Sequence, residues 1–273
     1  MLSYKRSTLC VSQSNTISLH MTDLNIFLIN LDSSKDRLKE SARQFDKFNL
    51  SFERISAVDG ASISNQELET HYSREKNARQ YYRALTVGEI GCYMSHLKVL
   101  EEIVARQLPY AFVFEDDFQL QADLREIDSK VLALPFDWDM IKLYQSQKNR
   151  RTAFATHQID SDLSLVIPNK VPAGTVAQII SFGGAKKILA HARPFGRPID
   201  IDYQHFWEKQ VSVLLAFPCP VNHGEIFDST VGREFLSRNE KGNFWLKQRL
   251  QINKFFNNKS NRKLIQKQYQ PYF

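Results

Sequence analysis

The sequence predicts an α/β protein built around an open, largely parallel β-sheet. Residues 25–58 have a strand–helix–strand pattern, and this order implies parallel strands joined by a right-handed crossover. The run from Tyr110 to Phe114 is continuously apolar, as in strands that are buried on both faces. The chain has 273 residues, 42% of them hydrophobic and 24% charged, so it can bury a large core.

The N-terminal half alternates strands with helices. Each predicted strand is a short apolar run, and each predicted helix repeats apolar residues at helical spacing, often behind a capping residue. The expected elements are a strand at 25–31, a helix from Ser33 or Ser34 to Phe48, a strand at 52–58, a short helix and an exposed loop at 62–83, a helix from Thr86 to Val104, the strand at 110–114 and a helix at 123–132.

The helix after Thr86 has an unusual composition. Thr86 and Glu89 have the Thr-x-x-Glu spacing of a capping box. Gly88 and Gly91 each cost a helix roughly 1 kcal/mol against alanine, so we expect them to allow a strand or a ligand to approach closely. His96 lies farther along this helix and is either a hydrogen-bonded core histidine or a group that acts in a site.

The C-terminal half continues the mixed pattern. The expected elements are a strand at 138–144, two short strands or a hairpin at 152–167, a strand at 175–181, a helix from Gly183 and a strand at 211–217. The segment from Pro198 to Asp202 is expected to be a short, loop-like second acidic site. Pro218 and Pro220 exclude a helix and a central strand, which predicts an irregular chain up to Gly224.

Three consecutive carboxylates, Glu115, Asp116 and Asp117, follow the buried strand at 110–114. Open α/β folds bind ligands at this edge of the sheet. Carboxylate oxygens suit Mg²⁺ or Mn²⁺, which in turn hold diphosphates. The alternative is a solvated acidic turn after an ordinary core strand.

The net charge of +6 is unevenly spread. Residues 238–273 contain nine Lys or Arg and one acid, whereas the rest of the chain has 27 basic and 29 acidic residues. The basic, aromatic-rich tail predicts an amphipathic helix that lies on an anionic membrane surface. The alternative is a helix packed on the sheet with its basic face in solvent. The chain lacks zinc-ligand spacing and RNP-type aromatic patterns, so a nucleic-acid partner is not expected.

Domain organisation and compartment follow from composition. We expect a flexible, Ser/Thr-rich arm at 1–22, one catalytic domain at 23–232 and the basic tail at 233–273. No apolar run is long enough for a transmembrane helix. The three cysteines show neither metal nor disulfide spacing, as in a cytosolic protein with reduced thiols.

Several motifs, in order along residues 24–232, resemble glycosyltransferase family 25, the sugar transferases of lipopolysaccharide and lipooligosaccharide synthesis. The most specific combination is a Gly-Glu-x-Gly-Cys-x-x-Ser-His block followed by Glu-Asp-Asp. The segments that carry the resemblance are Ile29-Asn30-Leu31 with Arg37, Gly88 to Cys92 with Ser95-His96-Leu97, Phe114 to Asp117, Gly174-Thr175 with Ser181 and Gly184-Ala185, and Pro198-Ile199-Asp200.

The resemblance implies a GT-A-like fold, in which a Rossmann-type mixed sheet is flanked by helices. It also implies an inverting hexosyltransferase that uses a nucleotide sugar, UDP-galactose above all, and a lipid-linked oligosaccharide acceptor. Such an enzyme is expected at the cytoplasmic face of the bacterial inner membrane. Gln178 stands where the family usually has an aromatic residue, which puts the shape of the sugar or acceptor pocket in doubt. The rival classes are an inactive sugar-binding relative and a basic nucleic-acid-binding protein.

The implied chemistry assigns roles to nine residues. Because adjacent strand residues point to opposite sides, Asp117 is expected to bind Mn²⁺ or Mg²⁺, and Asp116 to bind the ribose or a metal-bound water. His223 is a further candidate metal ligand. Asp200, ahead of Asp202, is the candidate base for the acceptor hydroxyl, although either aspartate could instead cap a helix. The residues expected to bind the nucleotide sugar are Asn30, Arg37, His96, Glu115 and Asp116.

Overall fold

The computed structural model describes residues 24–146, 150, 152–224 and 242–273. The predicted arm at 1–22 and the predicted boundary between residues 232 and 233 lie outside this described part of the chain.

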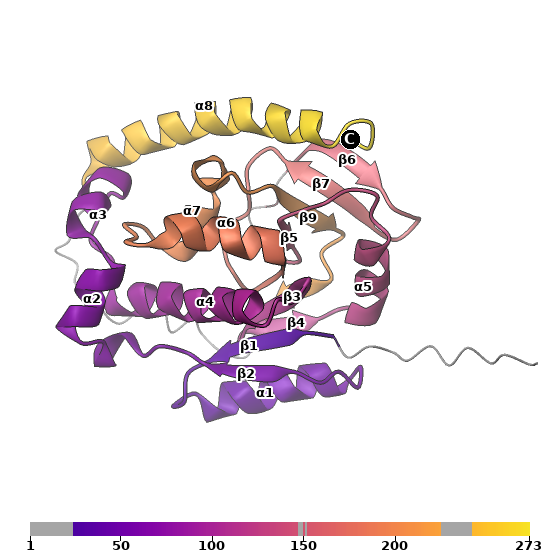
Figure 1. Ribbon diagram of the computed structural model, residues 1–273, viewed down its shortest axis with the longest axis horizontal. Helices are drawn as coiled ribbons and strands as arrows, with labels where there is room; N and C mark the ends of the chain where they lie inside the picture. The colour runs from indigo at the N-terminus through magenta and orange to yellow at the C-terminus, as the bar shows by residue number, and fades with distance from the viewer. Residues whose placement is uncertain (1–23, 147–149, 151, 225–241) are drawn as a thin grey trace, which may run out of the picture.

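A mixed eight-stranded sheet with the order β2-β1-β3-β8-β5-β9-β7-β6 forms the centre of the described fold (Figure 1). Strands β1, β2, β3, β5, β6 and β9 run in one direction, and β7 and β8 run in the opposite one. The strands are β1 Ile26–Asn30, β2 Glu53–Ser56, β3 Tyr110–Glu115, β5 Met140–Lys142, β6 Ala153–Gln158, β7 Ser164–Pro168, β8 Ala177–Ser181 and β9 Val213–Phe217. The predicted Rossmann-type mixed sheet flanked by helices is therefore confirmed.

The long helix α4 packs against β1, β2 and β3, and α6 packs against α4 and β8. Figure 1 shows α1 beside β1 and β2 at one side of the molecule and α8 along the opposite side. The helices are α1 Lys35–Asp46, α2 Asn65–His71, α3 Arg74–Gln80, α4 Val87–Ala105, α5 Leu124–Leu132, α6 Phe182–Ala192, α7 Ile199–Tyr203 and α8 Phe244–Gln268, with short 3₁₀ turns at Gly60–Ser62 and Phe206–Lys209.

The apolar run of β3 forms the middle of the core. The side chains from Ala111 to Phe114 are fully buried, as the uninterrupted hydrophobic pattern predicts. The ring of Phe45 on α1 meets Phe114 edge-on at 5.4 Å between centroids, and Phe118 lies 4.7 Å from Phe114. Phe114 directly before and Phe118 directly after the three carboxylates at 115–117 thus pack against each other, and this contact holds the turn in place.

The capping box at the start of α4 is confirmed. Thr86 accepts a hydrogen bond from the backbone of Glu89, whose carboxylate accepts one from the backbone of Thr86. A Cβ on Gly91 would lie 2.5 Å from the carbonyl oxygen of Val58, so Gly91 does allow a neighbouring segment to approach. A Cβ on Gly88 would meet no described atom closer than 3.9 Å, and Gly88 instead lines a cavity.

Three local predictions were wrong. The stretch 62–83 holds two helices, because Ser64 and Ser73 each cap one; Ser64 forms a capping box with Glu67. The segment 198–202 is mainly helical, as part of α7. Residues Val221–His223 form strand β10, which pairs antiparallel with the unpredicted strand β4, Phe118–Leu120. The two prolines precede β10, so every residue of that strand keeps its N–H.

The predicted C-terminal helix is present as α8 and packs on the body of the protein. Tyr269, which is 1% exposed, donates a hydrogen bond to Ser212 Oγ at 2.5 Å and packs against the ring of Phe136. Lys254 donates to Gln204, and Arg262 donates to the carbonyl of Asn169. Among the helices of the described chain, none combines the length and the apolar character that a membrane span requires.

Candidate functional site

A cavity of about 680 Å³ opens at the carboxyl-terminal edge of the parallel strands. Its walls come from the ends of β1 and β3, the loop after β2, the start of α4, the segment before β8, the start of α7 and the end of β10. Open α/β sheets place ligands at this edge, where strand order changes around the first strand. The fold thus brings together segments that lie almost 200 residues apart in the sequence.

Asp116 faces the β1–α1 side of the cavity. Its carboxylate accepts hydrogen bonds from Asn30 Nδ2 at 2.6 Å and from Arg37 Nε at 2.8 Å, and Arg37 Nη2 lies 2.5 Å away. Burial raises the pKa of Asp116 in spite of the Arg37 charge and these hydrogen bonds. Arg37 Nη1 is buried and has no hydrogen-bond partner among the described residues. The predicted nucleotide-side residues Asn30, Arg37 and Asp116 therefore lie together, with one guanidinium donor left for a ligand.

Asp117 lies in the bend between β3 and β4 and meets His223 as well as Arg37. Its Oδ2 lies 3.1 Å from His223 Nε2 and 3.5 Å from Arg37 Nη2, and its buried Oδ1 has no partner within the described chain. His223 Nδ1 lies 2.8 Å from the carbonyl of Gly224, and the hydrogen bond to Asp117 raises the pKa of His223. The short β4–β10 sheet places these two predicted metal ligands side by side.

The donor set at Asp117 and His223 fits a divalent cation. When Nδ1–H of His223 donates to the Gly224 carbonyl, the lone pair of Nε2 faces the negatively charged Asp117 carboxylate. The two groups then repel each other unless a proton or a metal cation lies between them. The buried, unpartnered Oδ1 of Asp117 offers another oxygen ligand. Asp116 fits less well, because Asn30 and Arg37 already bind both of its oxygens.

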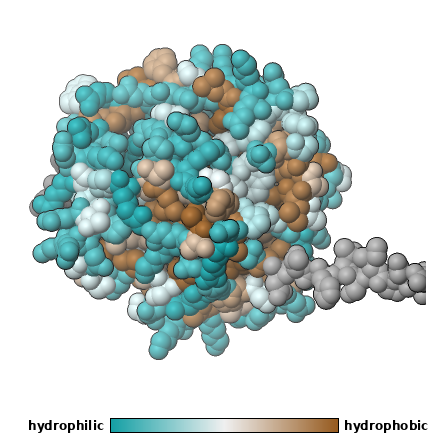
Figure 2. Space-filling view, viewed as in Figure 1, coloured by the Kyte–Doolittle hydropathy of each residue, from teal (hydrophilic) through white to brown (hydrophobic). Residues whose placement is uncertain are grey.

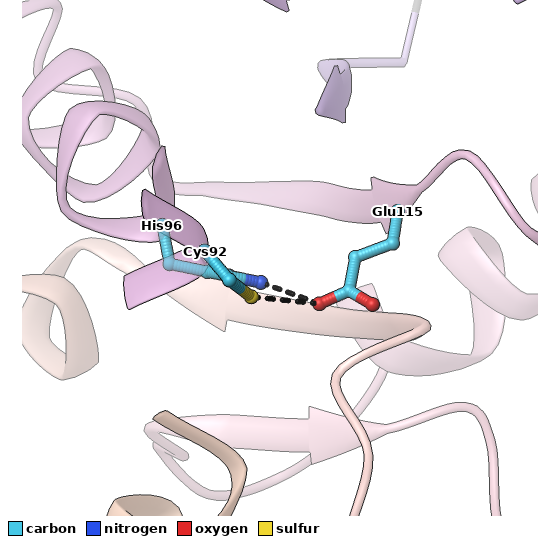
Figure 3. Close-up of side chains that lie close together, drawn as sticks. All are labelled: Cys92, His96 and Glu115. Carbon is cyan, nitrogen blue, oxygen red and sulfur yellow. Dashed lines mark hydrogen bonds and ion pairs between the residues drawn. The ribbon is translucent and has the colours of Figure 1, made fainter. Parts of the chain in front are cut away.

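One carboxylate oxygen of Glu115 contacts three side chains, and Figure 3 shows two of them, His96 and Cys92, reaching it from α4. This oxygen, Oε1, lies 2.9 Å from His96 Nε2, 2.5 Å from Thr175 Oγ1 and 3.8 Å from Cys92 Sγ. Burial would raise the pKa of Glu115. The hydrogen bonds from His96 and Thr175 and the positive charge of Lys142 outweigh this effect, so the pKa of Glu115 is lowered. The His96 side chain is itself buried, at 1% exposed, and it orients Glu115, which forms part of the cavity wall.

Cys92, His96 and Glu115 offer sulfur, nitrogen and oxygen ligand atoms within 4.8 Å of one another. Burial and the Glu115 charge raise the pKa of the Cys92 thiol. Hydrogen bonding to Glu115 accounts for this cluster, and the Asp117–His223 pair is the better metal site.

The two candidate bases lie in different surroundings. Asp200 lines the cavity, and burial raises the pKa of its carboxyl group. Asp202 is 5% exposed and lies outside that cavity, where it accepts hydrogen bonds from Tyr93 at 2.5 Å and from Arg197 and Lys209 at 2.7 Å each. The geometry therefore makes Asp200 available to a ligand and commits Asp202 to an internal ion-pair network.

Three other residues near the cavity were given no role from the sequence. Thr175 anchors Glu115, Tyr144 lines the cavity beside His223, and Lys142 is a fully buried lysine at the end of β5. The visible signals were the place of Thr175 in a family segment and a lysine inside the apolar run at 138–144. Gln178 is fully buried in β8 and is not part of the cavity wall.

Comparisons with known proteins identify the family of this chain. The family model described as glycosyltransferase family 25 (LPS biosynthesis protein) matches residues 23–203. Procollagen galactosyltransferase 2 of Homo sapiens is 29% identical over 184 residues, covering 65% of this chain and 29% of that protein. A probable inactive glycosyltransferase 25 family member 3 of Bos taurus is 28% identical over 219 residues, 71% of this chain and 35% of that protein.

The chain thus spans about a third of the length of these curated relatives. A solved Drosophila galactosyltransferase mutant in complex with manganese, UDP-Gal and xylobiose aligns over 76% of this chain and 71% of that one, with a TM-score of 0.37 and 9% identity. The family model covers well over half of the present sequence, including every cavity segment up to α7. The chain belongs to glycosyltransferase family 25.

Proposed function

We propose that the protein is an inverting, metal-dependent glycosyltransferase that moves a hexose, galactose from UDP-galactose, onto a lipooligosaccharide or lipopolysaccharide acceptor. The observation that carries this proposal is that one cavity joins the Asp117–His223 pair to Asp200. The pair suits a diphosphate-binding cation, and the aspartate suits a base. The family and the galactosyltransferase among its relatives support the choice of sugar.

The donor nucleotide belongs on the β1–α1 side of the cavity. Asn30 and Arg37 hold Asp116 there, so its carboxylate has a defined orientation toward a ribose hydroxyl. The free Nη1 of Arg37 is a charged donor suited to a phosphate oxygen. Glu115, held at Oε1 by His96 and Thr175, presents the rest of its carboxylate to the same ligand.

Asp117 and His223 would hold Mn²⁺ or Mg²⁺, which supplies Lewis-acid stabilisation to the diphosphate leaving group. In the transfer step, the acceptor oxygen forms a bond to the anomeric carbon while the bond from that carbon to the diphosphate oxygen breaks. Asp200 takes the proton of the acceptor hydroxyl, and the nucleoside diphosphate leaves with the bonding electron pair. Attack from the face opposite the leaving group inverts the anomeric configuration.

We further propose that α8 places the enzyme on the cytoplasmic face of a bacterial inner membrane, where lipid-linked acceptors reside. This helix contains seven Lys or Arg residues and no acid. Its outward side also carries exposed apolar side chains, and Figure 2 shows apolar and hydrophilic groups intermixed at the upper edge, where Figure 1 places α8. Aromatic groups beside cations suit the headgroup region of an anionic bilayer.

The test is hydrolysis and equilibrium binding of a panel of nucleotide sugars, with Mn²⁺ and with EDTA. We expect turnover of UDP-galactose with Mn²⁺, loss of that turnover in EDTA, and a fall of at least about 100-fold in Asp117→Ala, since the metal supplies several kcal/mol. Asp162→Ala removes an exposed aspartate outside the cavity and should behave as wild type.

Acceptor assays then compare lipooligosaccharide with a procollagen peptide, because the family description names the first class and a relative's name the second. Folded protein that binds no nucleotide sugar would refute the transferase proposal. Binding without turnover on any acceptor would instead favour the inactive alternative, which the names of some relatives bring into consideration.

A further inference from the structure

Lys142 is a buried lysine in the central sheet, where an apolar residue would pack as well. It occupies the last position of β5 in an otherwise apolar strand, and its side chain is 0% exposed. Burying an ammonium group costs several kcal/mol unless charges and hydrogen bonds compensate it. Its Nζ donates a hydrogen bond to the carbonyl of Gly174 at 2.5 Å, and the carboxylates that act on it are Asp200 and Glu115.

Gly174 connects this lysine to the cavity. Its carbonyl accepts the hydrogen bond from Lys142, and Gly174 lines the cavity together with Asp200, whose pKa the Gly174 N–H lowers. Gly174 has a φ of +86°, and a Cβ at this position would lie 3.1 Å from Tyr144 Cε1. This left-handed backbone favours glycine, and in it the Gly174 carbonyl meets the Lys142 ammonium behind the cavity wall.

We propose that Lys142 is a positioning residue for Asp200: through Gly174 it orients the carboxylate toward the acceptor hydroxyl, and its charge keeps that carboxylate ready to take a proton. This inference rests on the proposed transferase function. It assigns the buried lysine to the reaction although Lys142 itself does not line the cavity.

The electrostatic surroundings of Asp200 support this role. The groups that face it are Glu115 from β3, Cys92 from α4 and Lys142 from β5. Burial raises the pKa of Asp200 and Glu115 opposes its ionisation, whereas Lys142 and the N–H groups of Ile201 and Gly174 lower that pKa. Burial lowers the pKa of Lys142 to about 8, so the ammonium form still predominates at neutral pH. Lys142 is thus the cation that offsets two neighbouring carboxylates.

The test uses Lys142→Met, which keeps the length of the side chain and removes its charge. We expect at least about a tenfold fall in kcat for UDP-galactose hydrolysis at pH 7, where water takes the place of the acceptor. The acid limb of the kcat–pH profile should move to higher pH, with UDP-galactose binding changed less than about twofold. Lys187→Met, which removes a lysine paired with Asp139 outside the cavity, is the matched control.

A double-mutant cycle separates this role from a purely structural one. In an Asp200→Asn background, Lys142→Met should lower kcat by less than about twofold, because its partner group is already gone. If thermal unfolding shows that Lys142→Met does not fold, Gly174→Ala replaces it. This variant disturbs the link from Lys142 to Asp200 while the ammonium group stays in place, and it is combined with Asp200→Asn in the same double-mutant cycle.

Two results would overturn the inference. One is a kcat–pH profile of Lys142→Met whose acid limb stays at the wild-type pH. The other is a double mutant in which the fall in kcat equals the product of the falls in Lys142→Met and Asp200→Asn. Full turnover by Asp200→Asn in a protein that binds UDP-galactose would instead refute the assignment of Asp200 as base. Absence of nucleotide-sugar binding in the wild type would refute the proposed function itself, so the three failures are distinguishable.

Discussion

Asp200 and Asp202 are two residues apart in α7, yet their side chains lie in different surroundings. Positions two apart on a helix do not share a face, so one carboxylate meets the cavity and the other turns into the protein. Asp202 accepts hydrogen bonds from Tyr93, Arg197 and Lys209 in a site with almost no solvent. At the scale of single residues, this difference predicts separate effects on stability and on chemistry.

Asp202→Asn should destabilise the protein by about 3–5 kcal/mol at pH 7, because it leaves two buried cations without their shared anion. Urea unfolding measures this change, and the exposed Asp162→Asn is the control, with an expected change within about 0.5 kcal/mol. Unchanged stability combined with lost turnover would show that Asp202, rather than anchoring the fold, acts in the reaction.

The same residue gives the stability curve a pH dependence. Burial would raise the pKa of Asp202, but the charges of Lys209 and Arg197 outweigh it and lower the pKa from 3.8 to about 2. The unfolded chain therefore binds the proton first, and the contribution of Asp202 is complete above pH 3.8 and is lost as the pH falls through 2. The stability difference between wild type and Asp202→Asn should narrow over that range.

At the scale of elements, α8 presents two unlike faces. One side packs on the body through Ile265 and Tyr269, and the other exposes Trp245 by 79% and Phe256 by 62%. The alternative of a helix packed on the protein is therefore confirmed, whereas contact of the exposed basic, aromatic side with a membrane stays a prediction. Removing the whole tail would also remove Tyr269 and expose the residues that it packs against, so point substitutions on the exposed side of α8 are the cleaner test.

Trp245→Ser with Phe256→Ser should reduce co-sedimentation with vesicles of phosphatidylglycerol and phosphatidylcholine by at least about tenfold, because the change removes two of the four exposed aromatic side chains of α8. Leu132→Ser is the matched control, since Leu132 is 62% exposed but lies on α5. Undiminished binding by the double variant, or equal binding to vesicles without anionic lipid, would contradict the proposed membrane surface.

At the scale of the whole molecule, the cavity depends on distant segments being folded together. Asn30 and Arg37 come from the first strand and helix, whereas His223 comes from β10 near the end of the cavity-forming chain. A ligand that touches both sides must therefore stabilise the protein against global unfolding, by an amount set by its concentration relative to Kd.

UDP at about 100 times its Kd, with Mn²⁺, should stabilise the protein by about 2.7 kcal/mol and raise Tm by roughly 5–10 °C. In His223→Ala the Mn²⁺-dependent part of the shift should disappear, while the shift with UDP alone remains. His191→Ala, at an exposed histidine outside the cavity, should retain the full response. A full Mn²⁺-dependent shift in His223→Ala would exclude His223 from metal binding.

The sequence by itself determined the fold class and most of the elements. Periodicity located the strands around Ile29 and Phe112, and the Thr86–Glu89 pair located the start of α4, because these features depend on neighbours within a few residues. The family motifs added the order of the cavity segments. The β4–β10 pair was missed because three-residue strands carry almost no periodic signal, and their pairing joins residues about a hundred positions apart.

Tertiary structure alone decided the site. It separated Asp200 from Asp202, brought His223 to 3.1 Å from Asp117, and placed Lys142 behind Gly174. Side-chain direction, burial and long-range electrostatics set these relations, and none of them follows from spacing along the chain. A buried charge acquires its role from the groups packed around it, so the function of Lys142 becomes visible only in the folded molecule.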